Sequence, residues 1–510
     1  MRLPCWVNLI NGEDVNLKIP RFGINALTFL QIFPRITNHS STFLKSFFFS
    51  FIFVLFCIVN TFAISIPEEK EVGEKFMKMI KKEQIILKDP IANHMVNQVG
   101  QHILSSLPPQ PFDYAFYIVD DDVFNAFASP AANIFVYRGL ITSLDSVDEL
   151  AGIIGHEIAH AQSRHVSESI DRSKYIRIGS LAGILAGAII GGSSTSEAGV
   201  TIATGSLALG TTAILAFTRE NETEADEKGI MFLKNSCFAP EGLLSGLMKI
   251  RASDFRGTEN IPDYVKTHPG TASRIAHAES ILSEYTPPEN KPVCHQDYNF
   301  SMVKYRLLGL YAEIDTTYHL ISTQLKENPD DPALHYGMSL VCDRKRMNEP
   351  ALDHLKKALS IRVSDPMILL EMGRVYLENN APKKALKSLS GLTSDPVMGL
   401  MARYYQGIAY LELRKLPDAK KNFSNIIEAD PTRHIKTYYF LANIASLENK
   451  AGLSHYYLGV YYSERNQKKT AIVHLRKALE SLTDPSSRKE AEKLLNALNK
   501  KSNPWNSIKN

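Results

Sequence analysis

Two histidines and a glutamate lie close enough in this chain to bind a metal ion and activate water. His156, Glu157 and His160 form the sequence HEIAH. On a helix, residues four apart share one face, so both imidazoles can reach the same cation. Glu157 can take a proton from a water that the cation activates and later pass it to a leaving amine. The pattern predicts zinc-dependent hydrolysis of a peptide bond, and the alternative is a buried polar network without a metal.

A catalytic zinc needs a third protein ligand and one open coordination position for water or substrate. An acidic segment downstream offers the third ligand. Glu222 and Asp226 are four residues apart, so they share a helix face. One carboxylate can bind the metal while the other orients a ligand histidine. Glu224 points away from that pair. An acidic helix start is the alternative, because acids favour helix N-termini, but the combination with HEIAH favours a metal site.

A further histidine, His268, stands in the polar segment Thr267-His268-Pro269. It could be a fourth ligand that keeps the enzyme silent, or it could donate a hydrogen bond to the substrate oxyanion. A histidine in a surface loop is the alternative.

These residues need helices to position them, and the pattern from residue 66 to 285 is mainly helical with a small sheet. The expected helices are residues 71–88, 93–107 and 147–172, of which the last contains HEIAH. The segments 112–119 and 134–137 are rich in β-forming residues and are expected to pair. The fold class expected is mainly α, with a zincin-type α+β metallopeptidase domain followed by an all-α repeat domain.

The second half of the chain repeats with a period close to that of the tetratricopeptide repeat, which it resembles. Asp-Pro recurs at residues 331, 365, 395 and 430, and Gly-Ala pairs recur at Gly373/Ala385, Gly407/Ala419 and Gly459/Ala471. Small residues let the two helices of a unit cross closely, and the proline is expected to end the second helix. The predicted divisions are a signal region (1–63), a peptidase domain (66–285), a linker (286–299), a repeat domain (300–498) and a tail (499–510).

An apolar segment at residues 47–59, preceded by Lys45 and followed by Thr61-Phe62-Ala63, is typical of a secretory signal peptide. Two interpretations are open, because a long stretch precedes it. The true start lies downstream of Met1, which we favour, or the segment is an uncleaved anchor. Both place the rest of the chain outside the cytoplasm. A disulfide is compatible with that location, although none of the five cysteines has metal-type spacing.

Two other segments could handle substrate. Residues 178–217 contain two apolar runs rich in small residues, which are expected to form a peripheral lid with possible membrane contact, or alternatively an embedded hairpin. An edge strand formed by Asn133, Ile134, Phe135 and Val136 could accept an extended substrate as an added strand. The net charge of +3 and the lack of a basic patch with aromatic residues argue against nucleic acid as a partner.

HEIAH, the segment Glu222-x-x-Ala225-Asp226 and the preceding Arg219 together resemble the zincin family that holds CAAX prenyl proteases and HtpX heat-shock proteases. The segment 125–140 is also similar to that family's strand before the motif helix. With the signal peptide and the repeats, residues 70–490 resemble the periplasmic beta-barrel assembly-enhancing proteases. The chain departs from the family pattern at Thr218, where serine is common, and at Ala131-Ala132, where glycine is common, which puts loop detail in doubt more than the metal site.

The resemblance implies that Glu222 is the third ligand of one zinc ion per subunit and that Asp226 supports a ligand histidine. It also implies a periplasmic endopeptidase with a chaperone-like role, which degrades unfolded or stalled outer-membrane proteins and docks through its repeats on the barrel assembly machinery. Two alternatives stay open. One is a non-catalytic repeat scaffold with a latent zinc site, and the other is a membrane-embedded CAAX-type protease.

Overall fold

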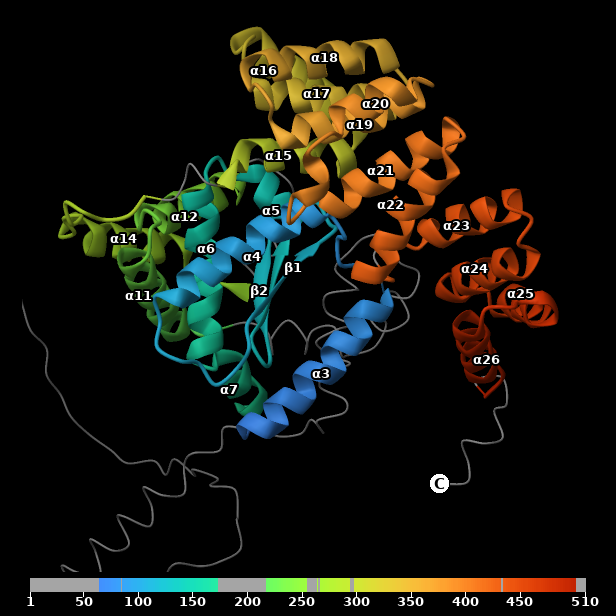
Figure 1. Ribbon diagram of the computed structural model, residues 1–510. Helices are drawn as coiled ribbons and strands as arrows, with labels where there is room; N and C mark the ends of the chain where they lie inside the picture. Colours follow the sequence, from blue (N-terminus) through green and yellow to red (C-terminus); the bar gives the residue numbers. More distant parts are fainter. Residues whose placement is uncertain are drawn as a thin grey trace, which may run out of the picture. The chain divides into compact units, whose positions relative to one another are not determined.

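Helices surround a small three-stranded sheet in the first part of the described chain (Figure 1). The computed structural model describes residues 64–83, 85–172, 217–254, 264, 267–293, 298–432 and 434–500. Before residue 300 the elements are α3 (Ile66–Glu83), α4 (Pro90–Ser105), β1 (Ala115–Val119), β2 (Ala126–Ser129), β3 (Asn133–Tyr137), α5 (Arg138–Ser143), α6 (Val147–Gln162), α7 (His165–Arg172), α11 (Arg219–Asn235), α12 (Glu241–Asp254) and α14 (Thr271–Ser283). Helix α6 packs against the sheet through β2 and β3, and against α11 and α12.

The sheet has the strand order β1-β3-β2, so β3 is its middle strand. β3 runs parallel to β1 and antiparallel to β2. The prediction that β1 and β3 pair is confirmed, but the prediction that Asn133, Ile134, Phe135 and Val136 form a substrate edge is wrong. All of these residues are buried, and the backbone of β3 already pairs with a strand on each side.

The outer edge of β1 is covered by the segment that follows α3. The predicted helix 71–88 instead ends at Glu83, and Ile86 forms a bridge with Val119. The Leu87 amide donates to the carbonyl oxygen of Ile118 at 2.8 Å. Pairing with the sheet overrides the helical pattern at Ile86 and Leu87, and the β-branched Ile86 favours the extended conformation. Among the described strands, β2 therefore has an outer edge that meets neither a strand nor an isolated bridge.

The predicted helix 147–172 is interrupted directly after the HEIAH segment. α6 ends at Gln162, and Arg164 takes the left-handed conformation with φ of 56° before α7 begins. That conformation costs a residue with a side chain roughly 1 kcal/mol. The Arg164 Nε donates to Glu69 Oε2 at 2.8 Å, and the guanidinium also donates to the Ile64 carbonyl. Glu69 is buried on α3, so the N-terminal helix holds this turn.

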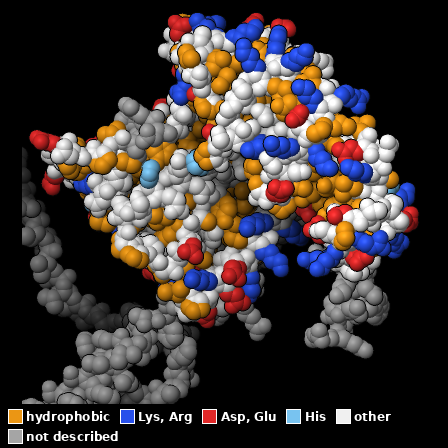
Figure 2. Space-filling model, in the orientation of Figure 1, with side chains coloured by type: hydrophobic (Ala, Val, Ile, Leu, Met, Phe, Trp, Pro, Cys, Tyr) orange, Lys and Arg blue, Asp and Glu red, His pale blue; other side chains and the backbone are white. Residues whose placement is uncertain are grey.

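Helical hairpins make up the described chain from residue 300 to residue 500. The elements are α15 (Phe300–Tyr311), α16 (Ile314–Glu327), α17 (Pro332–Arg344), α18 (Asn348–Ile361), α19 (Pro366–Glu378), α20 (Pro382–Ser388), η2 (Leu392–Ser394), α21 (Gly399–Glu412), α22 (Leu416–Ala429), α23 (Lys436–Leu447), α24 (Ala451–Glu464), α25 (Lys468–Ser481) and α26 (Pro485–Lys500). On the face drawn in Figure 2, basic side chains over these helices are interspersed with acidic and apolar ones.

Asp331-Pro332 and Asp365-Pro366 begin helices, contrary to the prediction that each proline ends one, whereas Pro396 and Pro431 lie in turns. Pro332 and Pro366 are the first residues of α17 and α19. Asp331 Oδ1 accepts a hydrogen bond from the Ala333 amide at 2.7 Å, which satisfies a free N–H of the first turn. Proline suits the first helical position because its missing N–H has no partner there.

The small residues of the repeats lie where two helices of a unit cross, as predicted. A Cβ atom added at Gly407 would lie 2.6 Å from the Phe423 ring. The same close approach occurs at Gly373 against Leu389, at 2.5 Å, and at Gly459 against Leu475, at 2.6 Å. These crossings therefore need glycine.

A buried polar network joins the first repeat helices to α4. Asp89 caps α4 by accepting hydrogen bonds from the amides of Ile91 and Ala92. Its Oδ2 also accepts from Arg306 Nε at 2.9 Å and from the Tyr311 hydroxyl at 3.1 Å. The described residues between Ile64 and Lys500 group into one compact unit, and the proposed domain boundaries remain a prediction.

Several predictions concern residues that the structure does not describe. The signal region 1–63 and all of the apolar segment 178–217 except Phe217 lie outside the described residues. In the described part, no helix is both long and apolar enough to span a bilayer. Cys237 is disulfide-bonded, and Cys342 is free and buried.

Candidate active site

The histidines of HEIAH lie on α6 at the point where α11 crosses it. Gly229 of α11 makes the crossing possible, because a Cβ atom there would lie 3.2 Å from the backbone nitrogen of His156. Thr218 caps α11 through a capping box with Asn221. The close crossing brings Glu222 and Asp226, one turn apart on α11, over His156.

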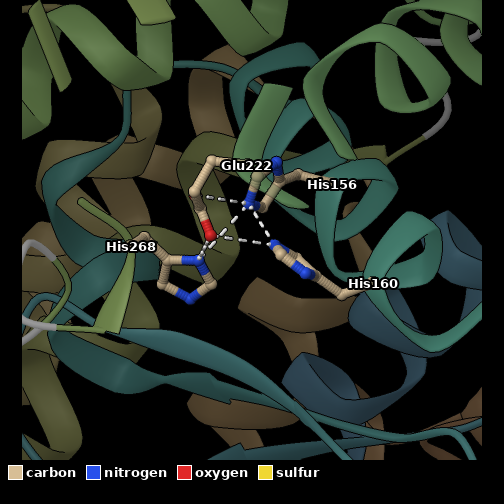
Figure 3. Close-up of side chains that lie close together, drawn as sticks. All are labelled: His156, His160, Glu222 and His268. Carbon is tan, nitrogen blue, oxygen red and sulfur yellow. Dashed lines mark hydrogen bonds and ion pairs between the residues drawn. The ribbon is translucent and has the colours of Figure 1, made fainter. Parts of the chain in front are cut away.

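Four side chains converge on one point (Figure 3). His156, His160, Glu222 and His268 are fully buried, and one ligand atom of each lies within 4.8 Å of the others. The Nε2 atoms of the two HEIAH histidines are 2.9 Å apart. Glu222 places Oε1 3.3 Å from His160 Nε2 and Oε2 3.5 Å from His156 Nε2. Two nitrogens and a carboxylate thus face a shared centre.

Asp226 lies behind His156, on the far side of its ring. Asp226 Oδ1 is 2.8 Å from His156 Nδ1. Since a carboxylate only accepts, Nδ1 carries the proton and the Nε2 lone pair is directed to the centre. Burial opposes the charged form of Asp226, but the neighbouring Arg274 outweighs it and lowers the pKa to about 2.

Arg274 of α14 is a buried residue that the sequence analysis missed. Its Nη2 donates to Asp226 Oδ1 at 2.7 Å and its Nε to Oδ2 at 2.8 Å. Its Nη1 forms an ion pair with Glu222 Oε2 at 2.7 Å. Burial raises the pKa of Glu222, yet His268 and Arg274 outweigh burial and hold it well below the usual range. No local spacing connects Arg274 with HEIAH, so sequence periodicity carried no signal for it.

His268 is held in the site by Tyr264, and it is fully buried rather than in a surface loop. The His268 amide donates to the Tyr264 carbonyl at 2.8 Å, and the two rings stack with centroids 4.4 Å apart. His268 Nδ1 lies 3.1 Å from Glu222 Oε1 and 3.4 Å from His156 Nε2. Its position suits both roles expected for it, because Nδ1 faces the centre and Nε2 faces Glu157 at 3.6 Å.

Glu157 is fully buried, and neither of its carboxylate oxygens has a hydrogen-bond partner among the described residues. Burial raises its pKa from the ordinary glutamate value. A buried carboxylate without a donor is costly unless it serves a chemical purpose. Beside a cluster of metal-type ligands, such a group is suited to accept a proton from a reacting water.

Phe217 closes another side of the cluster. Its ring stacks on His160 with centroids 4.1 Å apart and lies 5.4 Å from the His268 ring. The donor set, with two imidazole nitrogens and one carboxylate around a shared centre, fits a zinc ion. The Asp226–His156 contact is the support that such ligands receive from a second residue.

Comparisons with known proteins agree with this geometry. Residues 90–282 match the model of Peptidase family M48. The Beta-barrel assembly-enhancing protease of Yersinia pestis is 27% identical over 353 residues, which cover 68% of this chain and 71% of that protein. The protein of the same name from Escherichia coli strain K12 is 26% identical, with the same coverage. The Mitochondrial metalloendopeptidase OMA1 of Schizosaccharomyces pombe is 26% identical over 202 residues, which cover 40% of this chain and 56% of that protein.

The match to the peptidase family spans α4 to α14 and so includes every residue of the cluster. The similarity to the assembly-enhancing proteases extends well beyond that region, since it covers 68% of the chain. The chain is therefore a metallopeptidase with a Peptidase family M48 domain over residues 90–282, similar to the beta-barrel assembly-enhancing proteases.

Proposed function

We propose that this chain is a periplasmic zinc endopeptidase that removes misfolded or stalled outer-membrane barrel proteins. The observation that carries the proposal is the buried cluster of His156, His160 and Glu222 with the carboxylate of Glu157 beside it, which no described residue hydrogen-bonds. The names of the bacterial relatives support the connection with barrel assembly. The signal-like segment and the disulfide at Cys237 support an oxidising compartment outside the cytoplasm.

In this proposal His156, His160 and Glu222 hold one zinc ion, and Asp226 supports His156. When bound, the zinc supplies Lewis acidity that makes water a nucleophile near neutral pH and polarises the peptide carbonyl. Glu157 takes the proton of the attacking water and delivers it to the leaving amine. Glu157 is fully buried, so bulk water is excluded around its carboxylate and the electrostatic interactions of that group are stronger.

His268 has two roles left open by its geometry. As a fourth ligand it would hold the enzyme silent, and its Nδ1, 3.1 Å from Glu222, lies inside the ligand cluster. As an oxyanion donor it would stabilise the transition state. His268→Ala separates the two: activity rises if His268 restrains the enzyme, and it stays unchanged or falls if the latent-enzyme idea is wrong.

An extended substrate is proposed to add as a strand to β2, whose edge no described strand covers. Main-chain hydrogen bonds at this edge depend little on substrate sequence, which suits the removal of unfolded chains. The repeats at 300–498 are proposed to dock on the barrel assembly machinery and to provide a chaperone-like function. The stacked hairpins support this, because repeat arrays offer extended surfaces for protein partners.

Glu157→Gln tests the proposed function, because the amide has the same shape but cannot take a proton. The variant is expected to keep wild-type zinc content by atomic absorption and to lose casein cleavage. Glu227→Gln, an exposed glutamate on α11, is the matched control and should cleave like wild type. If Glu157→Gln cleaves casein normally, the enzymatic proposal is wrong. If it supports barrel assembly in cells as well as wild type does, the scaffold alternative is favoured.

A further inference from the structure

A second histidine lies directly behind His160, on the side away from the ligand cluster. The turn at Arg164 brings His165, which is 2% exposed, back onto the preceding helix turn. Its Nδ1 lies 2.9 Å from His160 Nδ1, and the two rings meet edge to face with centroids 5.0 Å apart. Two ring nitrogens at that distance share one proton, so one of them donates and the other accepts.

The other ring nitrogen of His165 faces a carboxylate. His165 Nε2 lies 3.3 Å from Glu224 Oε2. The second oxygen of Glu224 accepts hydrogen bonds from Ser163 Oγ at 2.9 Å and from Lys228 Nζ at 2.7 Å. These two donors fix the carboxylate, so that Oε2 stays directed to His165.

The direction of each hydrogen bond follows from the carboxylate, which can only accept. Glu224 therefore requires the proton of neutral His165 to be on Nε2, which leaves His165 Nδ1 as an acceptor. The proton between the two histidines then belongs to His160 Nδ1. His160 Nε2 keeps its lone pair and faces His156 and Glu222.

We propose that His165 and Glu224 are positioning residues, which fix the ring orientation and the tautomer of His160 for metal binding. They would do for the second histidine of HEIAH what Asp226 does for the first. The inference rests on the proposed zinc function of the cluster. It assigns a purpose to Glu224, the acidic residue that points away from the Glu222–Asp226 face.

The competing explanation is that His165 only fills space between α6, α7 and α11. His165→Phe keeps a flat ring but removes both nitrogens, so His160 Nδ1 loses its acceptor. His165→Asn keeps an oxygen near the position of Nδ1 and should restore part of the effect. Glu224→Gln keeps the shape, and since Ser163 and Lys228 donate to Oε1, the amide nitrogen would face His165 and force the opposite tautomer on both rings.

The measurement is the zinc dissociation constant of the full-length protein, from competition with a chromogenic chelator. Loss of such a supporting residue typically weakens metal binding about 10- to 100-fold. We expect a weakening in that range for His165→Phe and Glu224→Gln, and a smaller one for His165→Asn. Glu227→Gln is the matched control, because this residue also accepts from a histidine, His277, at 2.9 Å but lies on the exposed side of α11. It should bind zinc like wild type.

Thermal unfolding with and without zinc separates positioning from packing. A positioning role predicts that added zinc raises the melting temperature of His165→Phe less than that of wild type. A packing role predicts the same loss in both conditions and an unchanged zinc dissociation constant, and this result would overturn the inference. A wild-type protein that binds no zinc would instead refute the proposed function, so the two failures are distinguishable.

Discussion

Replacing Arg306 with methionine should destabilise the protein much more than the same replacement at Arg362. In both cases the Nε of an arginine donates to Oδ2 of an aspartate that caps a helix, at 2.9 Å for Asp89 and 2.8 Å for Asp365. The pairs differ in burial, because the Arg306 side chain is 5% exposed and the Arg362 side chain is 38% exposed. Both aspartates are buried, so the comparison tests the burial of the arginine. Each arginine also donates to one further group, which is the Tyr336 hydroxyl for Arg306 and Asn299 Oδ1 for Arg362.

The expected magnitudes follow from what each substitution leaves behind. Arg306→Met leaves the Asp89 carboxylate, 1% exposed, with only the Tyr311 hydroxyl and the first amides of α4 as donors. Removing one partner of a buried pair costs 3–5 kcal/mol, and these remaining donors place the expected loss near the lower end, at about 3 kcal/mol. The Arg362 side chain is largely in solvent, so its contribution should be close to that of an exposed pair, about 0.2–1 kcal/mol, and this is the loss expected for Arg362→Met.

Urea unfolding followed by far-UV circular dichroism gives the free energy of unfolding of each variant. The double variant Asp89→Asn/Arg306→Met supplies a second check, because asparagine still caps α4 but carries no charge. It should lose about 2 kcal/mol less than the sum of the two single variants, since the residues are in contact. Equal losses for Arg306→Met and Arg362→Met, or additive single effects, would refute the argument from burial.

Three further outcomes are expected. Phe135→Ala should destabilise the protein by about 3–5 kcal/mol in urea unfolding, because the fully buried Phe135 lies on the middle strand; a loss below about 1 kcal/mol would contradict that placement. Gly407→Ala should lower the unfolding free energy by about 1–3 kcal/mol, since the new methyl group would meet the Phe423 ring at 2.6 Å; a neutral result would show that the helix crossing can relax. Burial and the adjacent His335 lower the pKa of His354. The unfolded state therefore binds a proton at this residue more readily, and the free energy of unfolding should fall as the pH drops below about 6.5. His354→Asn should flatten this pH dependence, and an unchanged slope would refute the role of His354.

The local part of the site could be predicted from the sequence because a helix fixes which residues share a face. The four-residue spacings within HEIAH and between Glu222 and Asp226 predicted two pairs of facing side chains, and the structure brings them together with His268. Arg274 could not be predicted, because it enters from another helix and no spacing links it to the motif. The same holds for Phe217, which stacks on His160 from outside the helix.

The errors in the fold have a common physical origin in contacts between distant segments. Strand order depends on which strands pair. The β-rich pattern of residues 133–136 does not reveal that β3 pairs with a strand along each of its two edges. Ile86 and Leu87 fit a helical pattern, yet the edge of β1 draws them into an extended conformation. The period of the repeats was evident from the sequence. Whether Asp331-Pro332 ends one helix or begins the next depended on local backbone geometry.

The braced turn at Arg164 has a consequence for the survival of the enzyme under proteolytic attack. Glu69, near the start of the described chain, holds Arg164 in its left-handed conformation, and the next residue is the histidine that contacts His160. A chain trimmed through α3 would lose this brace together with the core in which Phe76 packs on Phe135. Damage from the N-terminal side would thus reach the histidine cluster and the middle strand of the sheet together.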